Sequence, residues 1–131
     1  MICINEVRNV LEKHDLSINL PEGATTVYNV EEKLDWLYPV KNDMYFLKKY
    51  EKHVPQGWYG FAIGTPIPKN WMDALDEILE LLIKCDPELE IHQIKLKYGG
   101  MRFYVISKVI EDLFDIELMI EDSMFNKALI Y

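Results

Sequence analysis

The chain of 131 residues contains few of the residues that build flexible or cross-linked proteins. Its six glycines and six prolines are scattered, and serine occurs only at 17, 107 and 123, which excludes a flexible linker or a low-complexity segment. Only two cysteines are present, Cys3 and Cys85, and neither has a cysteine or histidine nearby at ligand spacing. This pattern predicts reduced, buried thiols rather than a disulfide framework.

Long hydrophobic runs are also missing. The apolar runs span only a few residues, whereas roughly 20 are needed to cross a bilayer. The first residues lack the basic and apolar regions of a signal peptide. We therefore expect a cytoplasmic location and no membrane association. Half of the residues are hydrophobic, so the chain can bury one core, and we expect a single globular domain over 1–131.

Positive charge is scarce and unevenly placed. Fourteen Lys and Arg residues face 22 Asp and Glu residues, and the net charge of −8 argues against an ordinary nucleic-acid-binding protein. Residues 91–106 nevertheless contain three bases and no acid, while acids crowd the flanking segments. The sequence therefore predicts a basic segment between two acidic helices.

Recognisable catalytic and metal-binding motifs are absent. His14, His53 and His92 do not have the spacing of zinc ligands, and neither cysteine lies in a nucleophile motif. The chain contains no glycine-rich phosphate loop and no nucleophile elbow. We expect no metal and no cofactor, and the sequence favours a protein that is not an enzyme. A catalytic site assembled from distant residues stays open as an alternative.

The most informative segment is 94–105, in which two alternating runs flank Gly99-Gly100. This pattern predicts a β-hairpin with a two-residue turn. The core face would hold the pairs Tyr98–Met101, Leu96–Phe103 and Ile94–Val105. The other face would place Lys97 opposite Arg102 and Lys95 opposite Tyr104. Because like charges opposite each other destabilise a sheet, this face is expected to have an anionic partner inside or outside the molecule.

The clearest helix is predicted over about 69–84. Apolar residues recur there at steps of three and four, which buries one stripe: Trp71, Leu75, Ile78, Leu79 and Leu82. Four carboxylates form a second stripe: Asp73, Asp76, Glu77 and Glu80. This acidic stripe is either a solvated helix face or a surface for a basic partner, such as a nuclease groove or a cationic toxin.

The remaining pattern predicts helices over 4–14, 29–39 and 43–52, and strands over 24–28 and 58–63. Ser107 is expected to cap a last helix that ends near Met124, with Val109, Leu113, Ile116 and Ile120 inward, although 116–120 is also compatible with a strand. The predicted fold is α+β: a central antiparallel sheet built on the 91–106 hairpin and packed by several helices.

Two further groups of residues are candidates for binding. Lys95, Lys97, Arg102 and Tyr104 would bind phosphate or RNA, with Tyr104 stacking on a base, or would be paired with the protein's own acids or solvated. The net charge favours the second interpretation. Trp58 and Tyr59 follow a Pro-Gln-Gly turn and are candidate anchors for a protein partner.

The hairpin motif also resembles a known group of proteins. The run Gln93-x-Lys95-x-Lys97-Tyr98-Gly99-Gly100-Met101-Arg102-Phe103-Tyr104 follows Gly57-Trp58-Tyr59 and an acidic helix. This arrangement is similar to a group of small bacterial and phage proteins without an assigned activity, over about residues 55–124. Some members continue into a Ser-x-x-x-Cys-x-x-Cys tail. Ser123 here is followed by no cysteine, so a zinc role does not carry over.

Small size and acidity resemble those of immunity proteins that neutralise bacterial toxins. The preferred hypothesis is a non-enzymatic, protein-binding inhibitor of this type, which meets a basic partner through the acidic stripe and Trp58-Tyr59. The alternative is a phage or mobile-element accessory protein that binds nucleic acid or nucleotide through the basic hairpin face.

Overall fold

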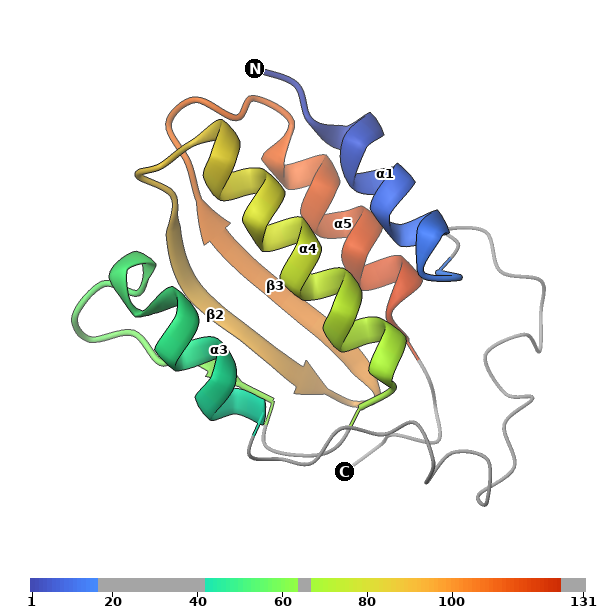
Figure 1. The fold of residues 1–131 in the computed structure, drawn as a ribbon, viewed down its shortest axis with the longest axis horizontal. Helices are drawn as coiled ribbons and strands as arrows, with labels where there is room; N and C mark the ends of the chain where they lie inside the picture. The colour runs from blue at the N-terminus through green and yellow to red at the C-terminus, as the bar shows by residue number, and fades with distance from the viewer. Residues whose placement is uncertain (17–41, 64–66, 126–131) are drawn as a thin grey trace.

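Helices cover one face of a small sheet (Figure 1). The computed structural model describes residues 1–16, 42–63 and 67–125. Within these ranges the elements are α1 (Ile4–Lys13), α3 (Asn42–Tyr50), the 3-10 helix η2 (Glu51–His53), β1 (Gly60–Ala62), α4 (Lys69–Cys85), β2 (Glu90–Lys97), β3 (Gly100–Ile106) and α5 (Leu113–Ser123). The predicted α+β fold is confirmed. The strand predicted over 24–28 and the helix predicted over 29–39 lie outside the described residues.

The three strands lie in the order β1-β2-β3. β2 and β3 form the predicted antiparallel hairpin, but β1 runs parallel to β2, with Phe61 beside Ile94. The sheet is therefore mixed, whereas the sequence predicted an antiparallel one. The reason is the connection, because α4 carries the chain from the end of β1 back to the start of β2.

The hairpin turn has the predicted length but lies one residue earlier. Lys97 pairs with Gly100, so Tyr98 and Gly99 form the turn, with φ of +53° and +80°. Both residues have the positive φ of a type I′ turn. The predicted partners were therefore wrong. Lys95 lies opposite Arg102, Gln93 lies opposite Tyr104, and Tyr98 is exposed rather than in the core.

The core face of the hairpin is the predicted one. Four of its apolar side chains have at most 1 % of their surface exposed: Ile94, Met101, Phe103 and Val105. An irregularity between Ile91 and Gln93 lets Ile91 face the core as well. α4 supplies the opposing surface with seven buried residues: Trp71, Met72, Ala74, Leu75, Ile78, Leu79 and Leu82. The 3.6-residue spacing in the sequence thus identified the helix face that packs in the interior.

The last helix begins at Leu113, not at the predicted Ser107. The Ser107 hydroxyl accepts hydrogen bonds from the N–H groups of Val109 and Ile110, which form a local turn. Val109 is consequently exposed, although it was predicted to face inward. The segment 116–120 is helical, so the strand alternative was wrong. After α5, the carbonyl of Met124 accepts a hydrogen bond of 3.0 Å from the N–H of Met101 and so covers the outer edge of β3.

Candidate binding surfaces

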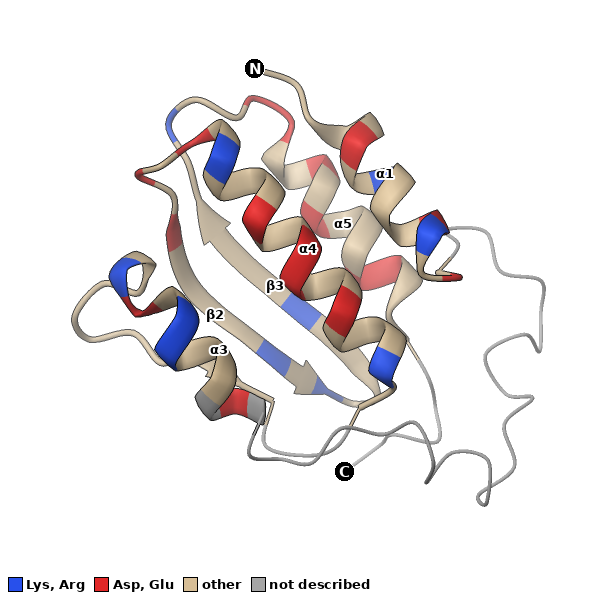
Figure 2. Cartoon of the chain, in the orientation of Figure 1, with Lys and Arg blue, Asp and Glu red and all other residues tan. Residues whose placement is uncertain are grey.

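The acidic stripe on α4 lies between helices that carry its neutralising charges (Figure 2). Within α4, Lys69 lies 3.2 Å from Asp73. Lys13 of α1 lies 2.8 Å from Glu77. Lys49 of α3 lies 2.8 Å from Asp76 and also pairs with Glu80. Each carboxylate of the stripe therefore has a cation of the same chain as its partner.

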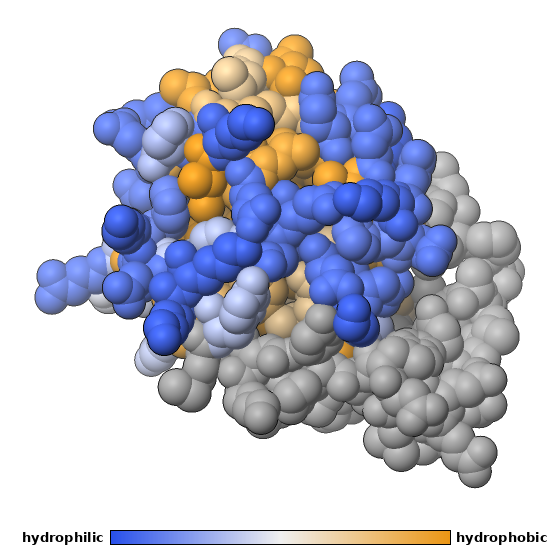
Figure 3. Space-filling model, in the orientation of Figure 1, coloured by the Kyte–Doolittle hydropathy of each residue, from blue (hydrophilic) through white to orange (hydrophobic). Residues whose placement is uncertain are grey.

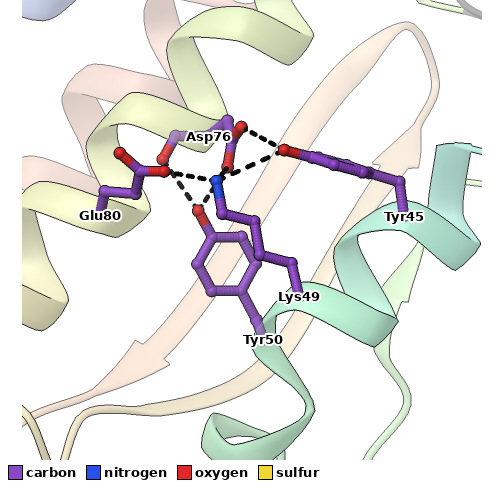
Figure 4. A network of polar contacts seen from close by, with 5 residues as sticks. All are labelled: Tyr45, Lys49, Tyr50, Asp76 and Glu80. Carbon is purple, nitrogen blue, oxygen red and sulfur yellow. Dashed lines mark hydrogen bonds and ion pairs between the residues drawn. The ribbon is translucent and has the colours of Figure 1, made fainter.

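Asp76 is the centre of a polar network that joins α3 to α4 (Figure 4). Its carboxylate accepts hydrogen bonds from Lys49, from the Tyr50 hydroxyl and, at 2.8 Å, from the Tyr45 hydroxyl. The Lys49 ammonium group also lies 5.3 Å from the centre of the Tyr50 ring. All three donors come from α3, so the network fastens α3 to α4.

Asp76 and Lys49 are charged at neutral pH, and Tyr50 keeps its proton. Burial disfavours the charge of Asp76, but the hydrogen bonds from Lys49, Tyr50 and Tyr45 outweigh it and lower the pKa of Asp76. Burial also opposes the charge of Lys49, and the hydrogen bonds to Asp76 and Glu80 outweigh it and raise the pKa of Lys49. Burial, followed by the hydrogen bond to Asp76, raises the pKa of Tyr50. A general acid or base works best with a pKa near the ambient pH, so this arrangement suits a structural role.

The basic residues of the hairpin lie on the sheet face opposite the core face. They alternate along β2 and β3 with residues of the core face, and successive side chains of a strand point to opposite faces. Arg102 is paired, because its Nη1 donates a hydrogen bond of 3.1 Å to Glu121 of α5. The neighbouring Glu117 accepts a bond from the N–H of Val105, and burial together with the charge of Glu121 raises the pKa of Glu117.

Lys95 and Lys97 differ from Arg102 in their pairing with carboxylates. Neither forms an ion pair with a carboxylate of the described residues, and Lys97 lies 5.6 Å from the centre of the Tyr98 ring. Tyr104 follows Arg102 by two residues on β3, so it lies on the same face, and 54 % of its surface is exposed. Among the described residues, the basic face is therefore only partly neutralised by the protein itself.

Trp58 and Tyr59 lie directly before β1, where they are 50 % and 76 % exposed. They line a groove together with residues of α3, of η2 and of the turn before β1: Leu47, Lys48, Glu51, Val54, Pro55, Gln56 and Gly57. The Trp58 ring stacks on His92 of β2, with centroids 4.2 Å apart and planes 17° from parallel. His92 precedes Gln93, the cross-strand neighbour of Tyr104. His92 therefore joins Trp58 to β2.

Sequence reasoning missed the residues that neutralise the candidate sites. Lys13, Lys49 and Glu121 come from elements 19 to 64 positions away from their partners along the chain. His92 was considered only as a metal ligand, not as a stacking partner. No local spacing signals such contacts, because they form only when the helices pack.

The protein-family models, the curated proteins and the solved structures that were compared with this chain contain no match to it. The resemblance of the hairpin motif to small bacterial and phage proteins therefore stays a prediction. In the ranges that the structure covers, no three His, Cys, Asp or Glu side chains come together as a metal site. In the same ranges no helix has both the length and the apolar character needed to cross a bilayer.

Proposed function

We propose that this protein is a non-enzymatic binding protein that contacts single-stranded nucleic acid through the sheet face opposite the helices. One observation carries the proposal. Lys95 and Lys97 have no carboxylate partner among the described residues, whereas every acid of the α4 stripe has a cation. Cations without internal partners are available to an anion, so the geometry favours the basic face over the acidic stripe.

The basic face combines the two kinds of side chain that bind unpaired strands. Lysines contact backbone phosphates, and exposed aromatic rings stack on bases. Tyr104 lies on the same face as Lys95, and Arg102 lies directly opposite Lys95.

The net charge of −8 limits how strongly this face binds. At an ionic strength of about 0.1 M the Debye length is about 10 Å, so charges on the far side of the molecule are largely screened. The local cations then act at contact distance, and we expect binding of modest affinity rather than long-range attraction.

The proposal is tested by fluorescence anisotropy with labelled single-stranded RNA and DNA over a series of salt concentrations. Phosphate contacts by Lys95 and Lys97 predict that the logarithm of the binding constant falls with that of the salt concentration with a slope of about −1.4, at about −0.7 per contact. Removing Lys95 and Lys97 together should abolish binding, and Tyr104→Ala should weaken it by about 1–3 kcal/mol. Lys84→Ala removes an exposed cation of α4 and is the matched control.

Three results would overturn this function. One is the absence of salt-dependent binding to either strand. Another is an equal loss of binding in Lys84→Ala, which would mean that general charge rather than the basic face is responsible. Binding of an acidic protein instead of nucleic acid would also reject the proposed ligand.

The exposure of Trp58 and Tyr59 beside a groove favours a second candidate, an immunity-type inhibitor of a basic protein such as a toxin. Tryptophan and tyrosine are enriched among the residues that dominate protein interfaces. We expect Trp58→Ala and Tyr59→Ala to weaken inhibition of a toxin encoded beside the gene. The acids of the stripe would contribute to toxin binding only if the toxin replaces their partners Lys13 and Lys49. A charge reversal of Asp76, Glu77 or Glu80 should therefore also destabilise the fold. Undiminished inhibition by both aromatic variants would exclude this surface.

A further inference from the structure

The two cysteines are far apart in the sequence but adjacent in the fold. The Sγ atoms of Cys3 and Cys85 lie 3.5 Å apart, and the Cys3 thiol donates a hydrogen bond to the Cys85 sulfur. Cys3 precedes α1 and is buried, whereas Cys85 is the last residue of α4 and is partly exposed. Both thiols are free. A sequence of this kind predicts two unrelated reduced thiols, and the tertiary structure makes them a pair.

The backbone around Cys3 is held in place. The N–H of Cys3 donates to both carboxylate oxygens of Asp112, at 3.1 and 3.0 Å, and the N–H of Ile4 donates to Asp112 at 2.8 Å. Cys85 lies at the C-terminal end of α4, where the backbone has fewer helical constraints. A disulfide needs sulfurs about 2.05 Å apart, so an approach of about 1.5 Å closes the gap.

We propose that Cys3 and Cys85 are a redox modification site, which low-molecular-weight disulfides such as oxidised glutathione convert reversibly into an intramolecular disulfide. Oxidation joins the start of α1 to the end of α4 and leaves the sheet face opposite the helices untouched. The inference is independent of the proposed binding function.

The exposure of the two thiols sets the order of the reaction. The Cys85 thiolate, which solvent reaches, attacks one sulfur of the small disulfide, forms a mixed disulfide and releases one small thiol. The Cys3 thiol then loses its proton to solvent and attacks the Cys85 sulfur, which expels the second small thiol. Two protein thiols and one small disulfide thus give one protein disulfide and two small thiols. Burial, with the hydrogen bond to Cys85 and the nearby charges of Cys85 and Asp112, raises the pKa of Cys3 to about 12, so the second step is the slower one.

The test is intact-mass spectrometry and thiol titration of the full chain equilibrated with reduced and oxidised glutathione. We expect the wild-type protein to lose two hydrogen atoms and both titratable thiols, to stay monomeric on a non-reducing gel, and to recover both thiols in dithiothreitol. Cys3→Ser should stop at the glutathione adduct of Cys85, because no second thiol can expel the glutathione. Cys85→Ser should stay unmodified, because Cys3 is buried. The thermal midpoint of the oxidised wild type should exceed that of the reduced form.

Three outcomes would overturn the proposal. In the first, the wild-type protein stops at the glutathione adduct. In the second, it forms a disulfide-linked dimer. In the third, it keeps both thiols in a buffer with a large excess of oxidised glutathione. The wild-type result decides the question even if a serine variant fails to fold. Circular dichroism of each variant before oxidation shows whether its result can be used.

Discussion

At the scale of single residues, the hairpin turn shows how packing changes the role of a sequence signal. Tyr98 adopts a positive φ, a conformation that is unfavourable for a bulky side chain, although Gly99-Gly100 offered two glycines for the turn. Gly100 instead faces Phe125, where an added Cβ would lie 3.2 Å from the Phe125 ring. A side chain at position 100 would therefore press on the Phe125 ring, and Tyr98 takes the strained position in the turn.

This assignment predicts opposite effects at two adjacent positions. Tyr98→Asn should raise the free energy of unfolding by about 0.5–1 kcal/mol, because asparagine accepts the left-handed conformation more readily than tyrosine. Gly99→Val should lower it by about 1–3 kcal/mol, since a β-branched residue is strained at φ of +80°. Urea denaturation measures both changes in the free energy of unfolding, and the slope of this free energy against urea concentration should stay unchanged. A turn centred on Gly99-Gly100 would instead make Tyr98→Asn neutral or destabilising.

Asp112 is a second residue whose role depends on distant contacts. It precedes α5, yet its carboxylate accepts the hydrogen bonds of Cys3 and Ile4 at the start of α1. Asp112→Ala should therefore cost about 1–2 kcal/mol, as the loss of a helix cap does. Hydrogen exchange should accelerate first in α1. Asp122→Ala removes an exposed acid of α5 and is the control; an equal loss of stability in both variants would refute the capping role.

At the scale of elements, α3 is held to α4 by polar contacts around one carboxylate. The tyrosine and lysine donors converge on Asp76, which is only partly exposed, and Tyr50 is also buried against Phe46 and Phe61. Loss of this carboxylate leaves partly buried donors without an acceptor, which costs more than loss of an exposed ion pair.

We expect Asp76→Asn to lower the free energy of unfolding by about 1–3 kcal/mol at neutral pH. Glu77→Gln is the control on the same helix, and it should cost less than about 1 kcal/mol, because the Lys13–Glu77 pair is more exposed. Denaturation midpoints at several pH values provide the measurement.

The lowered pKa of Asp76 also fixes the sign of the pH dependence. The folded protein holds the Asp76 proton less tightly than the unfolded chain does. The pKa of Asp76 in the unfolded chain is about 3.8. The stabilisation by Asp76 is therefore complete above about pH 4 and is lost as the pH falls through the lower folded pKa. The difference between wild type and Asp76→Asn should shrink as the solution is acidified. A difference in stability that grows at acidic pH would contradict the ion pair between Asp76 and Lys49.

At the scale of the whole molecule, the sheet separates two environments. One face lies against α4 and α5 and forms the core, and the other carries Lys95, Arg102 and Tyr104. The space-filling view shows hydrophilic residues over most of the helix-bearing side, with hydrophobic residues between them (Figure 3). Stability thus depends on one face of the two strands, and the binding that we propose would use the other.

Two adjacent residues of β3 test this division. Phe103→Ala should cost about 3–5 kcal/mol, because Phe103 is fully buried. Tyr104→Ala should cost less than about 1 kcal/mol, since half of the side chain is already exposed, while it weakens nucleic-acid binding. Chemical denaturation and the anisotropy assay separate the two effects. A larger loss of stability at Tyr104 would mean that the faces are reversed.

Local patterns in the sequence predicted α4 and the β2–β3 hairpin. Apolar steps of three and four predicted α4 and its buried face, and alternation predicted the hairpin and its core side. The same alternation was unable to fix the turn. Moving the turn by one residue shifts each cross-strand partner by two, and a shift of two keeps every side chain on its face.

Tertiary packing decided which charges and thiols are available. The sequence placed the four carboxylates together on one helix, but only the docking of α1 and α3 gave Glu77 and Asp76 their lysines. In the same way, α1 and α4 brought Cys3 to Cys85, and α5 brought Glu121 to Arg102. The physical reason is the separation of the interacting residues along the chain. Helix and strand patterns depend on residues a few positions apart, whereas these pairs depend on how whole elements bury their apolar faces against one another.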